Sequence, residues 1–352
     1  HISDLELKYL YQNCSLFVFT SRHEGFGLPV LEAMASGAVV LASDIPSIKE
    51  IIGDDQYLFD PSDEEMISKK IATFLVDDDL RLKSLNNSSG QVENFSWTYT
   101  AELANDVFKK VISSSNNDSF SALNWEMIND KRKSNHLKCI KRMISHLEKI
   151  IGLLPNNIYI EQLSTCIYLI ESETDIFDRR LIPGESIKDW HIEGPLDSDY
   201  SLAILNRNFS LALSKLIDNI TILNTEGPGD YYPNISFLEG KKDFYSLYLK
   251  AKVHKNSQIC SRNLYPPRVN DMNSRINMLH AYGWEETQFP SEWVEDFNSS
   301  LQAITVMSKK VKNILIDNGV YIPISICGLG VDHINQVSFD KKYILDTKSF
   351  VF

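Results

Sequence analysis

Several features are scarce in this 352-residue sequence, and each shortage argues against a class of protein. No apolar run approaches the roughly 18 residues that a membrane-spanning helix needs. Positive charge is in deficit, because 35 Lys and Arg face 47 Asp and Glu, which gives a net charge of -12. That balance disfavours nonspecific binding to a nucleic-acid backbone. We therefore expect no nucleic-acid partner and at most peripheral contact with a membrane.

Cysteine is also sparse, and its spacing excludes the usual cysteine-based sites. The sequence has no CxxC pair and no close Cys–His grouping of the kind that binds zinc or carries redox chemistry. We expect reduced, buried thiols in a cytoplasmic protein that lies, if anywhere near a membrane, at its inner face. No metal and no cofactor is expected. The five cysteines are Cys14, Cys139, Cys166, Cys260 and Cys327.

What the sequence does contain is alternation of strand-like and helix-like segments. Short apolar runs at 16–19 and 38–43 predict buried parallel strands, and 57–61 predicts a short edge strand. Helices are predicted at 29–36, 47–52, 63–76, 79–85 and 97–112. This alternation is typical of a doubly wound α/β domain. At 352 residues, the chain is long enough for two such domains.

A polar segment at 113–119 ends the first domain, and alternation begins again near residue 188. There, strand 190–193, a helix capped by Asp197 or Ser198, and strand 220–223 form a βαβ unit. Later in the chain, a predicted strand is followed by Ser308, a helix that ends at the capping residue Gly319, and another strand. We predict two Rossmann-like lobes, at 1–115 and 188–352, joined by a mostly helical connector at 116–187. The sequence starts without Met and stops in KSFVF, so we expect both lobes to be truncated.

The stretch RHEGFGLPVLEAMASG, from Arg22 to Gly37, is the best candidate for a binding site. It places a glycine-containing loop after a strand and before a helix, where unpaired backbone amides can bind phosphate. Gly25 and Gly27 allow close approach of a ligand. Taken singly, its two carboxylates have ordinary explanations, since an acid near a helix N-terminus is favoured by the helix dipole.

The two carboxylates, Glu24 and Glu32, are separated by seven residues. Glu24 lies in the loop and can accept hydrogen bonds from sugar hydroxyls. On a helical wheel Glu32 points away from the apolar stripe of its helix, so we expect it to reach the same cleft and bind vicinal hydroxyls such as those of a ribose. The combination of acids, glycines and a helix-starting proline is less expected by chance than any one of them.

The segment SRHEGFGLPVLEAMASGAVVLASDIPSIKEII resembles the donor-binding motif of the retaining glycosyltransferases of family 4, which have the GT-B fold. The resemblance covers about residues 1–111. It implies that Glu24 contacts the donor hexose and is the catalytic-site residue, and that Glu32 binds the ribose. It also assigns the sugar and diphosphate to the backbone near these acids. The donor-binding residues so implied are Ser21, Gly25, Phe26, Gly27, Leu28 and Glu32.

One feature departs from the family's pattern. The basic pair that neutralises the diphosphate in those enzymes has no counterpart in the matching segment, where Arg22 is a weak candidate. The substrate implied is a nucleoside-diphosphate sugar, with GDP-mannose as a family-based guess. The partner implied is a glycan or lipid-linked glycan acceptor.

The second half resembles the acceptor-side lobe of the same enzymes, as found in multi-domain transferases that build bacterial surface polysaccharides and O-antigens. Gly194 and Pro195 match a loop near the donor diphosphate. The alternative for the acceptor residues is structural, with Arg268 and Glu285 as an ion pair and Trp284 in the core. The candidates for an acceptor site are Arg262, Arg268, Arg275, Trp284, Glu285 and Glu286.

The order of the lobes, donor side first, is the reverse of a single GT-B enzyme. We interpret the chain as the end of one transferase module followed by the start of another, with little or no activity by itself. Two alternatives stay open: the lobes fold back on each other to share one cleft, which we consider the less expected arrangement, or the chain is a non-catalytic module that binds a nucleotide sugar. A GT-B epimerase or phosphorylase lacks support, because no motif for a pyridoxal-phosphate lysine is present.

Overall fold

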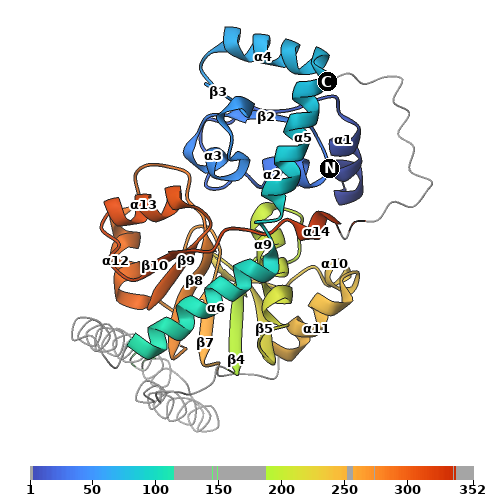
Figure 1. Cartoon of the computed structure of the whole chain (residues 1–352). Coiled ribbons are helices and arrows are strands. Elements are labelled where there is room, and N and C mark those ends of the chain that lie inside the picture. The colour runs from blue at the N-terminus through green and yellow to red at the C-terminus, as the bar shows by residue number, and fades with distance from the viewer. Residues whose placement is uncertain are drawn as a thin grey trace.

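A computed structural model of the chain describes residues 3–114, 188–251, 257–272 and 274–335, and the single positions 145, 149 and 337. The chain is an α/β protein with two Rossmann-like lobes (Figure 1). Nearly all of the expected connector, Cys139, Cys166 and the KSFVF segment lie outside the described residues.

The first lobe is built on a parallel three-stranded sheet in the order β1-β2-β3. Its central strand, β2, is buried along its whole length, because helices cover the sheet. Side chains of Asp63 and Asp77 cap the N-termini of α4 and α5. The elements of this lobe are α1 (Asp4–Asn13), β1 (Phe17–Phe19), α2 (Leu28–Ala35), β2 (Val40–Ser43), α3 (Pro46–Ile52), η1 (Asp55–Tyr57), β3 (Leu58–Phe59), α4 (Glu64–Val76) and α5 (Asp78–Val92).

The second lobe is built on a seven-stranded sheet in the order β10-β9-β8-β7-β4-β5-β6. Every pairing is parallel except that of β5 with β6. Its elements are β4 (Asp189–Gly194), α9 (Ser201–Leu213), β5 (Asn219–Glu226), β6 (Gly229–Asp230), α10 (Ile235–Glu239), α11 (Lys242–Ala251), β7 (Ile259–Arg262), β8 (Ile276–Tyr282), α12 (Ser291–Ser300), β9 (Ala303–Val306), α13 (Lys309–Asp317), β10 (Ile324–Ile326) and α14 (Asp332–Asn335).

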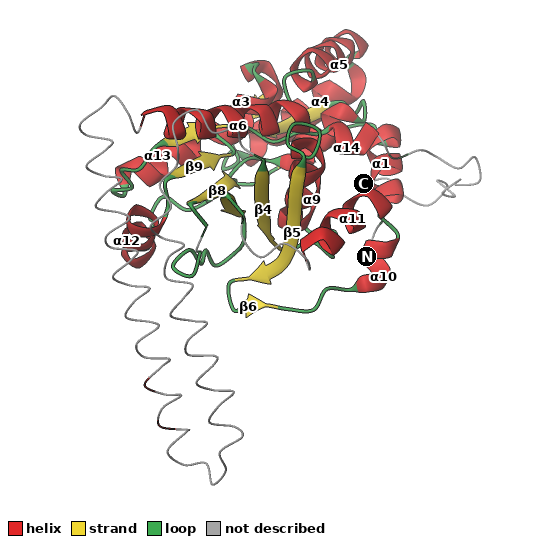
Figure 2. Ribbon diagram, turned by 90° about the horizontal axis from the view of Figure 1, so that it is seen from below, coloured by secondary structure: helices red, strands yellow, loops and turns green. Residues whose placement is uncertain are grey.

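The helix α6 (Trp97–Ser114) follows the first lobe in sequence but packs on the second. It crosses the sheet that contains β4 and β7, on the face that Figure 1 turns toward the viewer. Phe108 lies 4.9 Å from Trp190 of β4, measured between ring centroids, and both side chains are buried. Seen from below in Figure 2, α9 lies beside β4 and β5, and α11 packs against β5. The second lobe therefore takes one of its covering helices from the first part of the chain.

The expected cap of α9 is wrong. Tyr200 is the N-cap residue, and no side chain bonds to the first turn. Asp197 is engaged elsewhere, because its carboxylate accepts hydrogen bonds from the Tyr231 hydroxyl at 2.8 Å and from the Asn234 amide at 2.6 Å. The Asp197 carboxylate therefore does not cap α9, because it binds Tyr231 and Asn234, which are distant in sequence.

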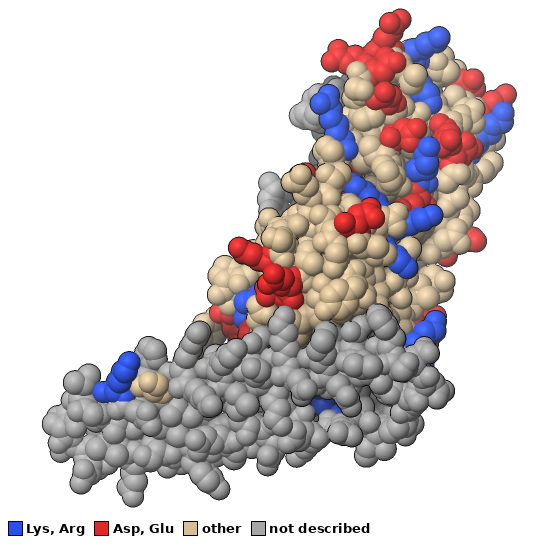
Figure 3. All heavy atoms as spheres, turned by 90° about the vertical axis from the view of Figure 1, so that its left-hand side faces the viewer, with Lys and Arg blue, Asp and Glu red and all other residues tan. Residues whose placement is uncertain are grey.

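Charged side chains of both signs are interspersed on the face of the molecule shown in Figure 3. Such mixing is typical of a solvated surface. The described part of the chain has no helix long and apolar enough to cross a bilayer. Of the cysteines in that part, Cys260 and Cys327 are buried free thiols and Cys14 is half-buried.

Candidate functional site

The loop between β1 and α2 is held by hydrogen bonds to its carbonyl groups. The Ser47 hydroxyl, from α3, donates to the Glu24 carbonyl at 2.9 Å. The Ser21 hydroxyl donates to the His23 carbonyl at 3.1 Å. With the carbonyls turned toward these donors, the loop passes from strand to helix at a fixed geometry.

Helix α2 begins at Leu28 with a backbone that only glycine accommodates easily. Gly27 is its N-cap residue, with φ +110°, and no side chain caps the helix among the described residues. A Cβ at Gly27 would lie 2.3 Å from Cδ1 of Ile48. Pro29 has no N–H, and the amides of Val30 and Leu31 donate to the Gly27 carbonyl, so among the described contacts Leu28 has the first-turn amide that stays available. The helix dipole favours an anion at this end. This end of α2 therefore has the properties of a phosphate-binding site.

The second lobe covers the same loop from the other side. The Ser308 hydroxyl donates to the Gly25 carbonyl at 2.7 Å. The Lys310 ammonium donates to the carbonyls of Glu24 and Glu285, at 3.0 Å in each case. A Cβ at Gly25 would lie 3.3 Å from backbone atoms of Trp284, so glycine permits this close approach. The two lobes therefore meet in one cleft, which is the arrangement that we considered less expected.

A cleft of about 630 Å³ opens between the two lobes at this point. Its volume falls within the range typical of small-molecule sites. The first lobe contributes the loop and the start of α2, and the second contributes chain segments at the carboxyl ends of β7, β8 and β9. The residues lining it are Glu24, Gly25, Phe26, Gly27, Leu28, Pro29, Tyr200, Ser201, Leu202, Leu205, Asn263, Leu264, Tyr265, Tyr282, Gly283, Trp284, Glu285, Glu286, Met307 and Leu329.

Glu24 is half-buried in this cleft. Burial raises the pKa of its carboxyl, a hydrogen bond with Ser21 lowers it, and the charge of Glu285 raises it further. Lys310 acts in the opposite direction, although burial lowers the pKa of the lysine itself. A carboxyl group with a raised pKa, beside a cation and at the mouth of a cleft, is suited to accept hydrogen bonds from hydroxyl groups.

Glu32 is not among the residues that line this cleft, so its expected place beside Glu24 is wrong, while its expected contact with a ribose stays a prediction. Only 6% of the residue is exposed. Its Oε1 lies 3.1 Å from Nε2 of His333 in α14. It lines a second cavity of about 790 Å³, also between the lobes. Leu28 and Pro29 line both cavities, so Glu24 and Glu32 lie on opposite sides of the first residues of α2.

An aromatic group forms the second-lobe end of the cleft. The Trp284 ring lies 5.1 Å from Phe289 and 5.5 Å from Trp293, and its Nε1 donates to the Gln288 carbonyl at 2.9 Å. Tyr265, 6.4 Å from Trp284, is 62% exposed. Trp284 is half-buried, so it contacts the core and also faces the cleft. Aromatic faces beside the exposed acids Glu285 and Glu286 can bind a pyranose ring.

Comparison with known proteins identifies the first part of the chain. Residues 1–89 match the family model described as "Glycosyl transferases group 1". This segment is similar to that family over about a quarter of the chain. The segment includes the Glu24 loop, α2 and Glu32, and it ends within α5.

Several relatives of this segment are bacterial mannosyltransferases. A serotype-specific mannosyltransferase of Escherichia coli, WbdA, is 42% identical over 114 residues, which are 32% of this chain and 14% of that protein. O-antigen chain mannosyltransferase B of E. coli is 40% identical over 97 residues, 28% of this chain and 26% of the relative. The lipopolysaccharide core biosynthesis mannosyltransferase LpcC of Rhizobium leguminosarum bv. viciae is 34% identical over 110 residues, 30% of this chain and 31% of the relative.

The chain thus matches only a minor part of the length of each of these relatives. No solved structure matches it significantly. The group 1 assignment covers the loop and helix that form the first-lobe side of the cleft, while the second lobe lies outside the matched residues.

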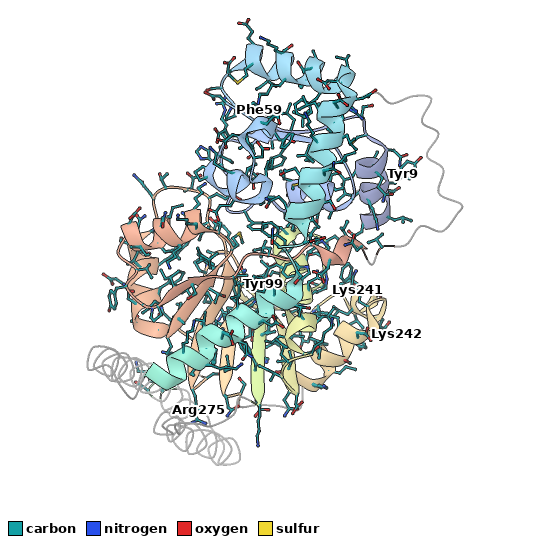
Figure 4. All side chains as sticks on the ribbon, in the orientation of Figure 1. Tyr9, Phe59, Tyr99, Lys241, Lys242 and Arg275 are labelled. Carbon is teal, nitrogen blue, oxygen red and sulfur yellow. The ribbon has the colours of Figure 1, made fainter. Side chains whose placement is uncertain are left out.

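Several predicted acceptor residues are not among those that line the cleft beside the Glu24 loop. Arg268 pairs with Asp271 and lies 3.7 Å from Asp230, so the ion pair with Glu285 that the structural alternative proposed is wrong. Arg262 is buried and paired with Glu193 and Asp271. Arg275, just before the start of β8, lies at the end of the sheet farther from the first lobe (Figure 4).

Gly194 and Pro195 lie behind the cleft wall. A Cβ at Gly194 would be 2.3 Å from Nδ2 of Asn206 and 2.6 Å from the Asn263 carbonyl oxygen. Asn206 in turn donates to the Pro195 carbonyl at 3.1 Å. Asn263 lines the cleft, so Gly194 is one layer removed from it. The glycine is explained by this close packing.

Trp284, Glu285 and Glu286 were named from the sequence and line the cleft, but the second-lobe residues that hold the Glu24 loop and Glu32 were missed. Ser308 was only placed between a strand and a helix, which it caps through the Val311 amide, and Lys310 and His333 were not singled out. Nothing local marks them, because the groups they bond in the Glu24 loop and α2 lie 283 to 301 positions away in sequence. The described residues include no cluster of three His, Cys, Asp or Glu side chains that could bind a metal ion.

Proposed function

We propose that the cleft between the Glu24 loop and the Trp284 segment is a site of hexose transfer from a nucleoside-diphosphate sugar to a glycan, with retention of configuration. The observation that carries this proposal is the arrangement of a group 1 loop, with its acid and uncapped helix start, against an aromatic and acidic wall from the second lobe. Two half-sites in one chain face each other across a single cleft.

On the donor side, Glu24 would accept hydrogen bonds from the hexose, and the backbone from Gly25 to Leu28 would hold the diphosphate. Catalysis would consist largely of positioning and of stabilising the charge that develops on the leaving diphosphate. None of the described residues that line the cleft is Lys or Arg. The N-terminus of α2 would therefore supply much of the favourable field.

On the acceptor side, Tyr265 and Trp284 would stack on a sugar ring, and Glu285 and Glu286 would accept from its hydroxyls. The relatives' names, mannosyltransferases of O-antigen and lipopolysaccharide core, support mannose as the hexose and GDP-mannose as the donor. The acceptor would be a glycan or lipid-linked glycan, met on the cytoplasmic face of a membrane.

The test is a transfer assay on the chain with GDP-mannose and mannoside acceptors, in which the anomeric configuration of the product is read by NMR. We expect an α-linked product, and we expect Glu24→Ala to lower the rate by at least about 100-fold. Glu65→Ala, at an exposed site on α4, is the matched control. Equal rates for the wild type and Glu24→Ala would contradict the proposal.

The same assay addresses the expectation that the chain is inactive by itself. Binding of GDP-mannose without turnover, measured by calorimetry, would instead favour the non-catalytic nucleotide-sugar module. If the chain binds no nucleoside-diphosphate sugar at all, both the transferase function and the binding-module function are excluded.

A further inference from the structure

Three side chains from distant parts of the sequence form a continuous hydrogen-bonded row between the lobes. Nε1 of Trp97 lies 3.0 Å from Nδ1 of His333, and Nε2 of the same imidazole lies 3.1 Å from Oε1 of Glu32. The side chains of His333 and Glu32 are largely buried, at 15% and 8% exposed. Hydrogen bonds in such a setting are stronger than in water, because the local dielectric constant is low and water does not compete for them.

The chemistry of the indole fixes the direction of this row. An indole N–H can only donate, so Nδ1 of His333 must accept. The neutral imidazole then carries its proton on Nε2, which donates to the Glu32 carboxylate. This bond engages Oε1, while Oε2 has no hydrogen-bond partner among the described residues. The second oxygen is therefore available to a ligand in the cavity that Glu32 lines.

His333 itself is held in place by the first lobe. Oδ1 of Asp332 accepts from the Trp97 amide at 2.8 Å. The Val331 amide donates to the Phe95 carbonyl at 3.2 Å. On the other side, the buried Lys8 ammonium donates to the Ile334 carbonyl at 2.9 Å. The imidazole thus has little freedom to turn away from Glu32.

We propose that His333 is a positioning residue for donor binding: it orients the Glu32 carboxylate so that Oε2 accepts hydrogen bonds from the ribose hydroxyls of a nucleoside diphosphate. This inference rests on the proposed function. It adds that the ribose contact, made by the first lobe, depends on a side chain supplied by the second. A buried carboxylate without this donor would be left partly unsatisfied and free to rotate.

The test uses the full chain and measures binding of ADP, CDP, GDP and UDP and of their 2′-deoxy counterparts. The readout is the ratio of ribo to deoxy affinity for whichever base binds best. We expect the wild type to prefer the ribonucleotide by about 10-fold, as for one hydrogen bond to a charged group. His333→Leu should reduce that ratio to near one.

His333→Gln is the matched variant, because its carbonyl can accept from Trp97 and its amide can donate to Glu32. We expect it to keep most of the preference. If His333→Leu does not fold, Trp97→Phe provides a second route: it removes only the donor to Nδ1, and it should weaken the preference and change the His333 tautomer seen by ¹⁵N NMR.

A wild-type ratio that persists in His333→Leu, or in Trp97→Phe where the leucine variant is unfolded, would overturn the positioning role and leave the proposed function intact. A wild type that binds none of the four diphosphates would overturn the proposed function and this inference with it.

Discussion

The hydroxyl of Ser308 donates a 2.7 Å hydrogen bond to the carbonyl of Gly25, a residue 283 positions earlier in the chain. Ser308 also accepts from the Val311 amide and so caps α13. The carboxylate of Glu50, from α3, accepts from the Lys309 and Lys310 amides of the same helix. The start of α13 is thus anchored on the first lobe, where an acid favours the positive end of the helix dipole.

Replacement of Lys310 should loosen the Glu24 loop. Lys310→Met removes the ammonium that bonds the Glu24 and Glu285 carbonyls, so we expect the free energy of unfolding to fall by about 1–3 kcal/mol. Hydrogen exchange of residues 22–28 should become faster. Lys309→Met is the control, since that exposed side chain makes no such bond among the described contacts. Equal hydrogen-exchange rates in the two variants would show that the Lys310 hydrogen bonds do not hold the loop.

Substitution of Gly27 should cost more than substitution of Gly37. Both have positive φ, at +110° and +84°, but a Cβ at Gly27 would clash with Ile48, whereas a Cβ at Gly37 meets nothing within 4 Å. We expect Gly37→Ala to destabilise by about 1–2 kcal/mol and Gly27→Ala by about 2–4 kcal/mol, because crowding adds to strain. Urea denaturation measures both. A smaller loss for Gly27→Ala would mean that Ile48 moves aside freely.

Stability should depend on pH through Glu24. Its pKa is raised in the folded chain, chiefly by burial, so the folded state favours the protonated form. The stabilising contribution is complete below the ordinary carboxyl pKa and disappears as pH rises through the raised value. Glu24→Gln, which stays neutral, should therefore be more stable than the wild type at pH 7 and nearly equal to it at pH 4. Chemical denaturation across this range provides the measurement, and a constant difference would contradict the assignment.

Truncation of Phe108 should damage the lobe that the sequence does not associate with it. The Phe108 ring is 1% exposed and packs on Trp190, so Phe108→Ala should cost about 3–5 kcal/mol. Hydrogen exchange should accelerate in β4 and α9 more than in β1 and β2. Tyr99→Ala, at an exposed position on α6 that Figure 4 labels, is the control. Acceleration confined to the first lobe would exclude the crossing.

Sequence reasoning located most elements of the first lobe but fewer than half of those of the second, because short apolar runs and capping residues are local signals that only some elements carry. The strands at β1, β2, β4 and β9 all follow such runs, and Gly319 has the positive φ expected just after a helix. The prediction for α9 failed at its cap because Asp197 is bound by Tyr231 and Asn234, which no local pattern reveals.

The sequence pointed to the loop on the first-lobe side of the cleft and to part of the second-lobe side, where Trp284, Glu285 and Glu286 line it. The loop with Glu24 and two glycines can be recognised in the sequence, because the residues that form it are neighbours along the chain. Glu32 was misplaced because the wheel treats one face of a helix as solvent, and in the structure His333 lies there. Tertiary packing alone determines which second-lobe residues contact this loop. The sequence therefore predicts that a binding site lies at the loop, but not which distant residues hold the loop in place.

The path of α6 also bears on how this chain could be divided. The polar segment that begins at residue 113 looks like a natural place to cut, yet a cut there would leave the helix with the first lobe and strip it from the second lobe's sheet, exposing Trp190 to water. Two halves split at this point and produced separately should therefore reassociate, because Phe108 of the first half packs on Trp190 of the second.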